Sequence, residues 1–387
     1  MQLAPQGGMR QAGWFFDRWA VLDRPLRHLP RGAATLLLII FAAAMAFAAI
    51  SAAPASELRP PAAGETASIS EGTPRDSGDL ALYERIGDRV KQGEDYYTVA
   101  AEEHRARNYP VRPFVTIRPP TLAKVRAMLG PEGLRILAIA LLGVTILVWE
   151  RKLAKLGEPL VTRAGFAILL YLGAVGVFTE GNLLLHELPA GLLLTLAFGL
   201  YSRRWWWLAL LCALAAVALR EIAVHFLVAW IAVALVQRRW REVAALAAAL
   251  VAVGIGLAFH KAGVEATLLP GDPASPGWVE ALGPRFVLES LVRFSWLVLI
   301  PPIAAVPLAL LALLGWMGLP MRTGMFAGLW FTGFFAATGL LAREDNFYWV
   351  LLTMPAYLAG LLLVPRAIAD LMASARGATG PTTSKQS

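Results

Sequence analysis

The 387-residue sequence is poor in charge and almost free of cysteine. Only 16% of the residues are Asp, Glu, Lys or Arg, whereas 57% are hydrophobic and the mean hydropathy is +0.58. Because a soluble domain could not bury this much apolar surface, the composition indicates a membrane protein. The single cysteine, Cys212, excludes an intrachain disulfide.

Signatures of several soluble enzyme classes are also missing. There is no Walker-type Gly-rich loop or soluble Rossmann unit, so no nucleotide site is predicted. His186-Glu187 would need a second zinc-binding histidine at position 190, which is alanine, so no metal site is predicted. No basic patch is interleaved with stacking aromatics, so the pI of about 9.9 does not indicate a nucleic-acid partner.

We expect an all-α polytopic membrane protein with ten spanning helices. Most apolar runs are close to the ~20 residues that cross a bilayer, and short charged or Gly/Pro-marked turns separate them. The expected spans are 33–53, 134–149, 162–179, 183–201, 205–219, 221–236, 242–260, 291–313, 323–341 and 346–364. The runs 134–149 and 205–219 are short for a span.

Lysine and arginine are distributed unequally between the two sets of loops. With a cytosolic N-terminus, the cytosolic segments hold 18 Lys/Arg and 6 acidic residues, whereas the opposite side holds 17 and 21. These counts give net charges of +12 and −4. By the positive-inside rule they predict an integral protein of the bacterial inner membrane whose N- and C-termini are cytosolic.

The sequence predicts three parts of unequal size. They are a cytosolic segment with an interfacial helix (1–32), a transmembrane domain (33–364) and a cytosolic tail (365–387). Two outer loops are long, at 54–132 and 261–288, and the second contains successive Gly/Pro turns. Chemistry outside the membrane is therefore expected in the first of these loops.

The first outer loop changes character along its length. Residues 54–77 are rich in Ala, Ser, Glu, Pro and Gly and predict a flexible linker. Apolar residues then recur at helical spacing over 79–93, which predicts an amphipathic helix, and a second helix is expected over 97–107. The proline-dense run 109–120 predicts extended chain, followed by a third short helix that ends at Met128.

One motif in this loop resembles a known superfamily. Asp79 opens the amphipathic helix, Tyr83 follows one turn later, and Gly93-x-x-Tyr96-Tyr97 closes it. This pattern resembles the first outer loop of the GT-C superfamily of integral-membrane glycosyltransferases. Looser similarities at Leu185-His-Glu-Leu-Pro, at Leu219-Arg-Glu-Ile-Ala and at Arg238-Arg-Trp-Arg-Glu242 extend the resemblance over roughly residues 30–260.

The resemblance implies transfer of a sugar from a polyprenyl-phosphate donor to a lipid, glycan or protein acceptor, with no other cofactor assigned. Asp79 would act as the general base on the acceptor hydroxyl, and displacement at the anomeric carbon would invert its configuration. The plainer alternative is that Asp79 is a helix N-cap, for which Asp is a favoured residue. Both roles are compatible in one residue.

The remaining site candidates are charged or aromatic residues at the outer turns. Candidates for binding the donor phosphate are Arg220, Arg112, Arg118 and Arg343, and candidates for the sugar or acceptor are Tyr83, Tyr96, Tyr97, Glu180, His186, Glu187, Glu221 and His225. His225 is expected on the same helical face as Glu221. For most of these residues the alternative is an ordinary solvated turn or helix end.

Two other functions are compatible with the composition. A transporter or flippase of lipid-linked glycan predicts buried charges deep within spans and related half-repeats, whereas the charges here gather at the outer turns. A non-catalytic membrane subunit with the same architecture is the other alternative. The lipid bilayer is the expected partner in all three cases.

Overall fold

The computed structural model describes residues 24–54 and 78–377. Within these ranges the fold is all-α and contains no β-strand. The elements are η1 (Pro25–His28), α2 (Arg31–Ile50), α4 (Asp79–Lys91), α5 (Tyr96–Ala106), η2 (Phe114–Thr116), α6 (Thr121–Lys155), α7 (Leu160–Gly173), η3 (Val175–Phe178), α8 (Glu180–Leu183), α9 (Glu187–Leu200), α10 (Trp206–Leu219), η4 (Glu221–Ala223), α11 (Val224–Val236), α12 (Trp240–Glu265), α13 (Gly283–Arg293), η5 (Trp296–Leu299), α14 (Pro302–Met317), α15 (Met321–Leu341), η6 (Glu344–Leu352), α16 (Met354–Tyr357), η7 (Leu358–Leu363) and α17 (Val364–Ala375). The interfacial helix and most of the linker expected before Ser77 lie outside the described residues.

The structure contains helices of the length and polarity that membrane spans require. Within residues 24–54 and 78–377, five segments are long and apolar enough to cross a bilayer: Arg31–Ile50, Phe114–Lys155, Trp240–Glu265, Arg322–Leu341 and Met354–Ala375. Shorter apolar helices, among them α7, α9, α10 and α14, pack with them. The chain is therefore a polytopic helical membrane protein, as the composition predicted, although fewer than the ten expected spans reach full length.

Helix α9 lies at the centre of one half of the bundle. Nearly all of its side chains are buried, and it packs against α6, α10, η6 and α16. Its end is filled by an aromatic cluster in which Trp149 lies 5.3 Å from Phe198 and 5.4 Å from Trp316 between ring centroids. Such a short helix is apolar on every side because protein surrounds it.

The expected spans 291–313 and 346–364 are each broken. Helix α13 ends at Arg293, and α14 begins only at Pro302 after an extended Ile300. The pair Pro301-Pro302 explains this break, because a residue that precedes proline is disfavoured in helical conformation. The second segment is a series of short helices, η6, α16 and η7, in which Gly360 allows close backbone contact with α14.

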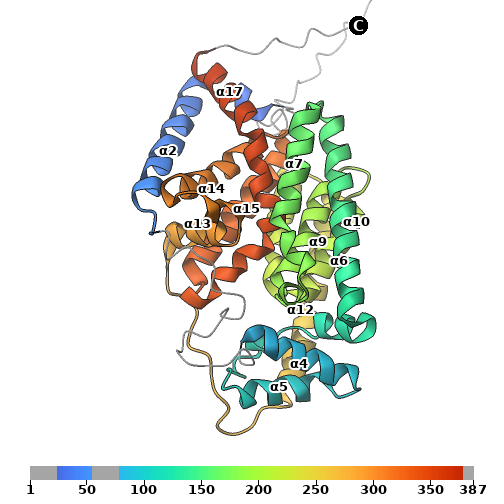
Figure 1. Cartoon of the computed structure of the whole chain (residues 1–387). Coiled ribbons are helices and arrows are strands. Elements are labelled where there is room, and N and C mark those ends of the chain that lie inside the picture. Colours follow the sequence, from blue (N-terminus) through green and yellow to red (C-terminus); the bar gives the residue numbers. More distant parts are fainter. Residues whose placement is uncertain (1–23, 55–77, 378–387) are drawn as a thin grey trace, which may run out of the picture.

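The expected cytosolic tail begins as a helix. Helix α17 continues directly from η7 and packs against α2 and α14 (Figure 1). Its buried Asp370 forms an ion pair with Arg24 at 2.6 Å. The N-terminal and C-terminal parts of the described chain are thus held together at one end of the bundle.

A small helical unit that contains α4 and α5, here called the loop unit, covers the opposite end of the bundle. Figure 1 shows α4 and α5 below the long helices, and both match the helices predicted for the first outer loop. The third predicted helix is also present as the first part of α6, which is interrupted by non-helical Gly130. Leu82 and Ile86 of α4 share a buried apolar cluster with Val264 of α12, which fixes this loop unit to the bundle.

Polar contacts also join the two outer loops. Arg105 of α5 binds both carboxylate oxygens of Asp272, at 2.6 and 2.9 Å, and Arg112 donates to the Asp272 carbonyl at 2.6 Å. An isolated β-bridge pairs Arg112 with Ala274. The loop at 261–288 therefore holds the loop unit in place beside the bundle.

Candidate functional site

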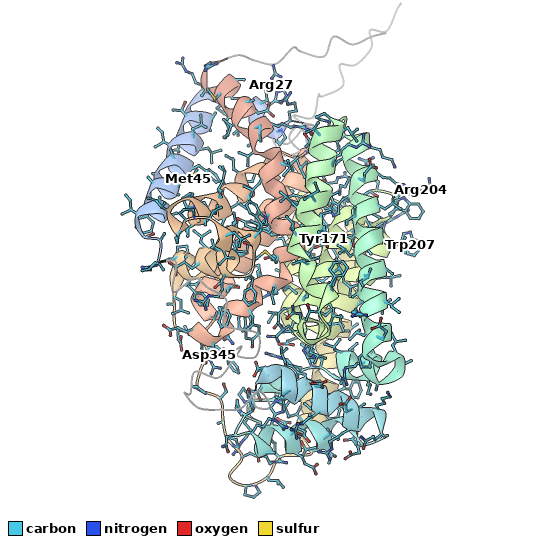
Figure 2. The ribbon with its side chains drawn as sticks, in the orientation of Figure 1. Arg27, Met45, Tyr171, Arg204, Trp207 and Asp345 are labelled. Atoms are coloured by element: carbon cyan, nitrogen blue, oxygen red, sulfur yellow. The ribbon has the colours of Figure 1, made fainter. Side chains whose placement is uncertain are left out.

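A cavity of about 490 Å³ lies between the loop unit and the adjacent ends of the bundle helices. Its lining comes from α4, from the extended chain before α6, from the α10–α11 junction and from two turns. The lining residues are Asp79, Leu82, Tyr83, His104, Tyr109, Pro110, Val115, Thr116, Arg118, Arg220, Glu221, Ile222, Ser275, Trp278, Arg343, Asp345, Asn346, Tyr348 and Trp349. Figure 2 shows Asp345 at the lower edge of the bundle, on the side that faces the loop unit.

Asp79 lies at the start of α4 but does not cap it. Gly78 occupies the N-cap position, and no side-chain hydrogen bond caps the helix. The Asp79 carboxylate instead accepts a hydrogen bond from the Tyr109 hydroxyl, and burial raises the pKa of Asp79 above its ordinary value of 3.8. The N-cap interpretation of Asp79 is therefore wrong, and its carboxylate faces the cavity.

The ring of His104 packs against the ring of Tyr109. The two rings meet edge to face with centroids 6.1 Å apart, and His104 Nδ1 donates to the Ala100 carbonyl at 2.7 Å. Burial lowers the pKa of His104 to about 4, so its imidazole is neutral at pH 7. His104 thus orients Tyr109 without adding charge to the cavity.

Arg118 is bound by two phenol groups. Its Nε lies 3.2 Å from the Tyr83 hydroxyl and its Nη2 lies 3.0 Å from the Tyr348 hydroxyl. The Tyr96 hydroxyl donates to the backbone carbonyl of Arg118 at 2.5 Å. None of the hydrogen-bond partners of Arg118 in the described chain is a carboxylate.

Arg220 has a different environment, because two carboxylates surround it. It is 1% exposed, its Nε lies 2.5 Å from Glu187 Oε1, and its Nη1 pairs with Glu221. Its backbone is extended between α10 and η4. The Arg220–Glu187–Glu221 triad therefore has a formal net charge of −1, and the two carboxylates hold Arg220 in place.

Arg343 lies in the turn that precedes η6. Its Nη1 donates to the Ser275 hydroxyl at 3.0 Å, and its guanidinium lies 5.7 Å from the centre of the Trp278 ring. These neutral partners leave its charge uncompensated by hydrogen-bonded carboxylates among the described residues.

Three cavity-lining residues carry buried polar atoms that have no hydrogen-bond partner in the described structure. These are the acceptor Glu221 Oε2 and the donors Arg343 Nε and Trp349 Nε1. Buried polar atoms in native proteins are nearly always paired, and an unpaired set around one cavity is what a polar ligand would satisfy. The arrangement offers both donors and an acceptor.

The other sequence candidates lie outside the cavity lining. Tyr97 contacts His260, and both line a separate apolar groove between α10 and α12. Arg112 is exposed and joins the outer loops. His186 is buried behind Tyr83 at a ring distance of 4.8 Å. His225 follows Glu221 by four residues in the continuous helical segment Glu221–Val236, and its ring packs on Phe334. Glu180 begins α8, and its side chain lies outside the described part.

Sequence reasoning missed several residues that line the cavity. Tyr109, Tyr348 and Trp278 contribute directly, and Asp345 and Trp349 come from the same region as Arg343. Tyr109 lay in the proline-dense run, so its position in a rigid extended segment was the available signal. Nothing local distinguished Tyr348 from other aromatic residues at the ends of spans.

Metal ligands do not gather within the described chain: no group of three His, Cys, Asp or Glu side chains is arranged to hold an ion. Comparison of the sequence with protein-family models and curated proteins, and of the structure with solved structures, gives no match.

Proposed function

We propose that this protein is a membrane glycosyltransferase that moves a sugar from a polyprenyl-phosphate donor to an acceptor hydroxyl. The observation that carries the proposal is the Asp79 carboxylate, which faces a cavity that also contains Arg118. A raised pKa makes Asp79 a stronger base than an exposed carboxylate, and Arg118 offers a planar cation for an oxyanion.

In the proposed reaction the acceptor hydroxyl gives its proton to Asp79. The acceptor oxygen forms a bond to the anomeric carbon, and the bond from that carbon to the donor phosphate oxygen breaks. The polyprenyl phosphate leaves with the electron pair. Direct displacement inverts the anomeric configuration, and Arg118 stabilises the charge that develops on the leaving phosphate.

The cationic residues divide into two groups under this proposal. Arg118 and Arg343 are held by neutral partners, so a phosphate can add to their environment without displacing a carboxylate. Arg220 already pairs with Glu187 and Glu221. We therefore assign the donor phosphate to Arg118 with Arg343 beside it, and we assign Arg220 to the wall of the cavity.

An apolar groove next to the cavity supports a lipid-linked donor. It has a volume of about 360 Å³ and runs between α10 and α12, where Val217, Val253 and Leu257 line it. Arg118 lines the cavity and its neighbour Pro119 lines the groove. Because these two residues are adjacent in the chain, a prenyl chain in the groove would place its phosphate near Arg118.

The transporter alternative receives less support from the packing. A transport path would have to cross the bundle, but the aromatic cluster of Trp149, Phe198 and Trp316 fills the space around α9. The non-catalytic alternative is separated from the proposal by the variant experiment below.

The test compares Asp79→Asn with Asp95→Asn in cells that lack the wild-type protein. Asp95 is the N-cap of α5 and accepts a bond from Thr98 at 3.0 Å, a role that Asn can also fill. We expect mass spectrometry of envelope glycolipids to show loss of a glycosylated product with Asp79→Asn and its retention with Asp95→Asn. Unchanged glycolipids when the whole protein is deleted would contradict the proposal, and loss of product on deletion with full retention in Asp79→Asn would remove Asp79 as the base.

A further inference from the structure

A second polar pocket lies at the end of the bundle opposite the Asp79 cavity. It has a volume of about 450 Å³ and is lined by five arginines and one carboxylate, namely Arg203, Arg238, Arg239, Arg241, Arg322 and Glu242. Glu242 is buried and already pairs with Arg239 while accepting a bond from Trp230. The lining therefore has a net charge of +4 with its only carboxylate engaged.

The free cations of this pocket come from three separate segments. Arg203, Arg241 and Arg322 form no hydrogen bond or ion pair with a carboxylate in the described part of the chain. Arg203 and Arg322 both act electrostatically on Arg239, so like charges are crowded at this point. Like charges gather at a cost unless an anion offsets them.

Helix dipoles add to this positive potential. The pocket takes Trp206 from the first position of α10, Trp240 from the first position of α12 and Arg322 from the second position of α15. None of the three helices has a side-chain cap hydrogen bond at this end. The N-terminal amides of long helices favour anions, and here three such ends meet.

An unsatisfied amide gives independent evidence for a ligand. Gln237 lines the same pocket, and both its side-chain nitrogen and its side-chain oxygen are buried without a hydrogen-bond partner among the described residues. A phosphate ester with hydroxyl groups would satisfy both atoms, because phosphate oxygens accept from the amide nitrogen and a hydroxyl donates to the amide oxygen.

The surroundings of the pocket favour a lipid over a soluble anion. Trp205, Trp207 and Trp240 are 41%, 48% and 64% exposed, respectively. Figure 2 shows Arg204 and Trp207 projecting outward from the bundle, away from the loop helices. Exposed tryptophans beside arginines at the ends of spans mark the depth of lipid headgroups.

We propose that this pocket binds the phosphate of an anionic phospholipid headgroup, and that its arginines select anionic over zwitterionic lipid. The ligand chemistry is a phosphate ester in the leaflet at this end of the bundle. This inference is independent of the glycosyl-transfer proposal, because it concerns a different cavity and requires no turnover.

The test measures lipid binding to purified, delipidated protein by native mass spectrometry. Phosphatidylglycerol is the anionic probe, phosphatidylcholine is the zwitterionic probe, and inorganic phosphate is the soluble competitor. Each arginine near a headgroup contributes a factor of about five in affinity, so Arg203→Gln/Arg322→Gln should weaken phosphatidylglycerol binding about 25-fold. Phosphatidylcholine binding should be unchanged. The variant Arg203→Lys/Arg322→Lys should lose less phosphatidylglycerol affinity because it retains the charge.

The control variant is Arg151→Gln/Arg204→Gln, which removes the same charge at the same end but outside the pocket. We expect less than a twofold change, with melting temperatures recorded for every sample to exclude unfolded protein. Equal loss in both double variants, or equal binding of the two lipids to the wild type, would overturn the proposal. Displacement by inorganic phosphate at the same concentration as the lipid would identify a soluble anion and overturn the lipid assignment.

Discussion

Replacement of Arg220 by glutamine tests whether the triad of Arg220, Glu187 and Glu221 holds the cavity wall. Arg220 and Glu187 are each 1% exposed and their atoms lie 2.5 Å apart, so glutamine would leave Glu187 buried and charged. Removing one partner of a buried ion pair costs about 3–5 kcal/mol in unfolding free energy. We expect Arg220→Gln to lose an amount in this range.

The companion variant is Glu187→Gln/Arg220→Gln, which removes the buried pair as a whole. Because no uncompensated charge remains at position 187, the double variant should be more stable than Arg220→Gln alone. Unfolding would be followed in mixed micelles at increasing fractions of denaturing detergent. Arg204→Gln, a change at an exposed arginine at the opposite end, should shift the free energy by less than about 0.5 kcal/mol.

Two results would refute this reasoning. One is a loss below about 1 kcal/mol for Arg220→Gln, which would mean that the ion pair contributes no more than an exposed pair. The other is a double variant whose loss equals the sum of the two single losses, because independent sites add and coupled sites do not.

The remaining predictions concern Asp79, Arg118 and the orientation. Burial raises the pKa of Asp79 in the folded protein above 3.8, so the wild type loses stability as pH rises above about 4. The stability of Asp79→Asn relative to the wild type should therefore rise over that window, as measured by unfolding at several pH values. Transferase activity should increase with pH through the raised pKa of Asp79 and should fall ~10²–10⁴-fold in Asp79→Asn; near-normal turnover would remove Asp79 as the base. Arg118→Lys should weaken donor use while leaving the protein folded, because lysine keeps the charge but loses the planar fork. Donor kinetics equal to those of the wild type would contradict the phosphate assignment. In a Cys212→Ala background, an impermeant thiol reagent should label Trp278→Cys in intact cells and leave Arg376→Cys unlabelled, and the reverse pattern would overturn the orientation.

The short-range features of the loop unit followed from the sequence. Helix α4 begins at Asp79 as the spacing of Leu80, Tyr83 and Ile86 predicted, and the kink at Gly130 separates the third predicted helix from the span that follows it. These features depend on residues within one or two helical turns. Periodicity and glycine conformation are local properties, so sequence reasoning can reach them.

The errors in the spans have a different origin. Hydropathy alone joined 291–313 into one helix, although Pro301-Pro302 carried a visible stop signal. The series η6, α16 and η7 gave no comparable warning, because its geometry depends on close backbone contact between Gly360 and α14. Only the packed structure contains that contact.

Pairings over long sequence distances were beyond local reasoning. Arg220 and Glu187 are separated by 33 positions and Arg118 and Tyr348 by 230, so no local pattern indicated which arginine would be neutralised. This is why the sequence offered Arg220 and Arg118 alike as candidates for the phosphate, and why the proposed assignment to Arg118 had to wait for the contacts.

Under the proposed transfer reaction, the charge balance of the cavity gives the two groups of arginine different roles. Three arginines and three carboxylates line it. Carboxylates hold Arg220, phenols hold Arg118, and the Ser275 hydroxyl holds Arg343. A phosphate that enters adds negative charge, which Arg118 and Arg343 can accept because their hydrogen bonds are to neutral groups. The same added charge disfavours the ionised form of Asp79, so donor binding would strengthen Asp79 as a base at the moment when the acceptor must lose its proton. A phosphate drawn instead to Arg220 would have to compete with Glu187 and Glu221 and would leave one of these carboxylates buried without a partner.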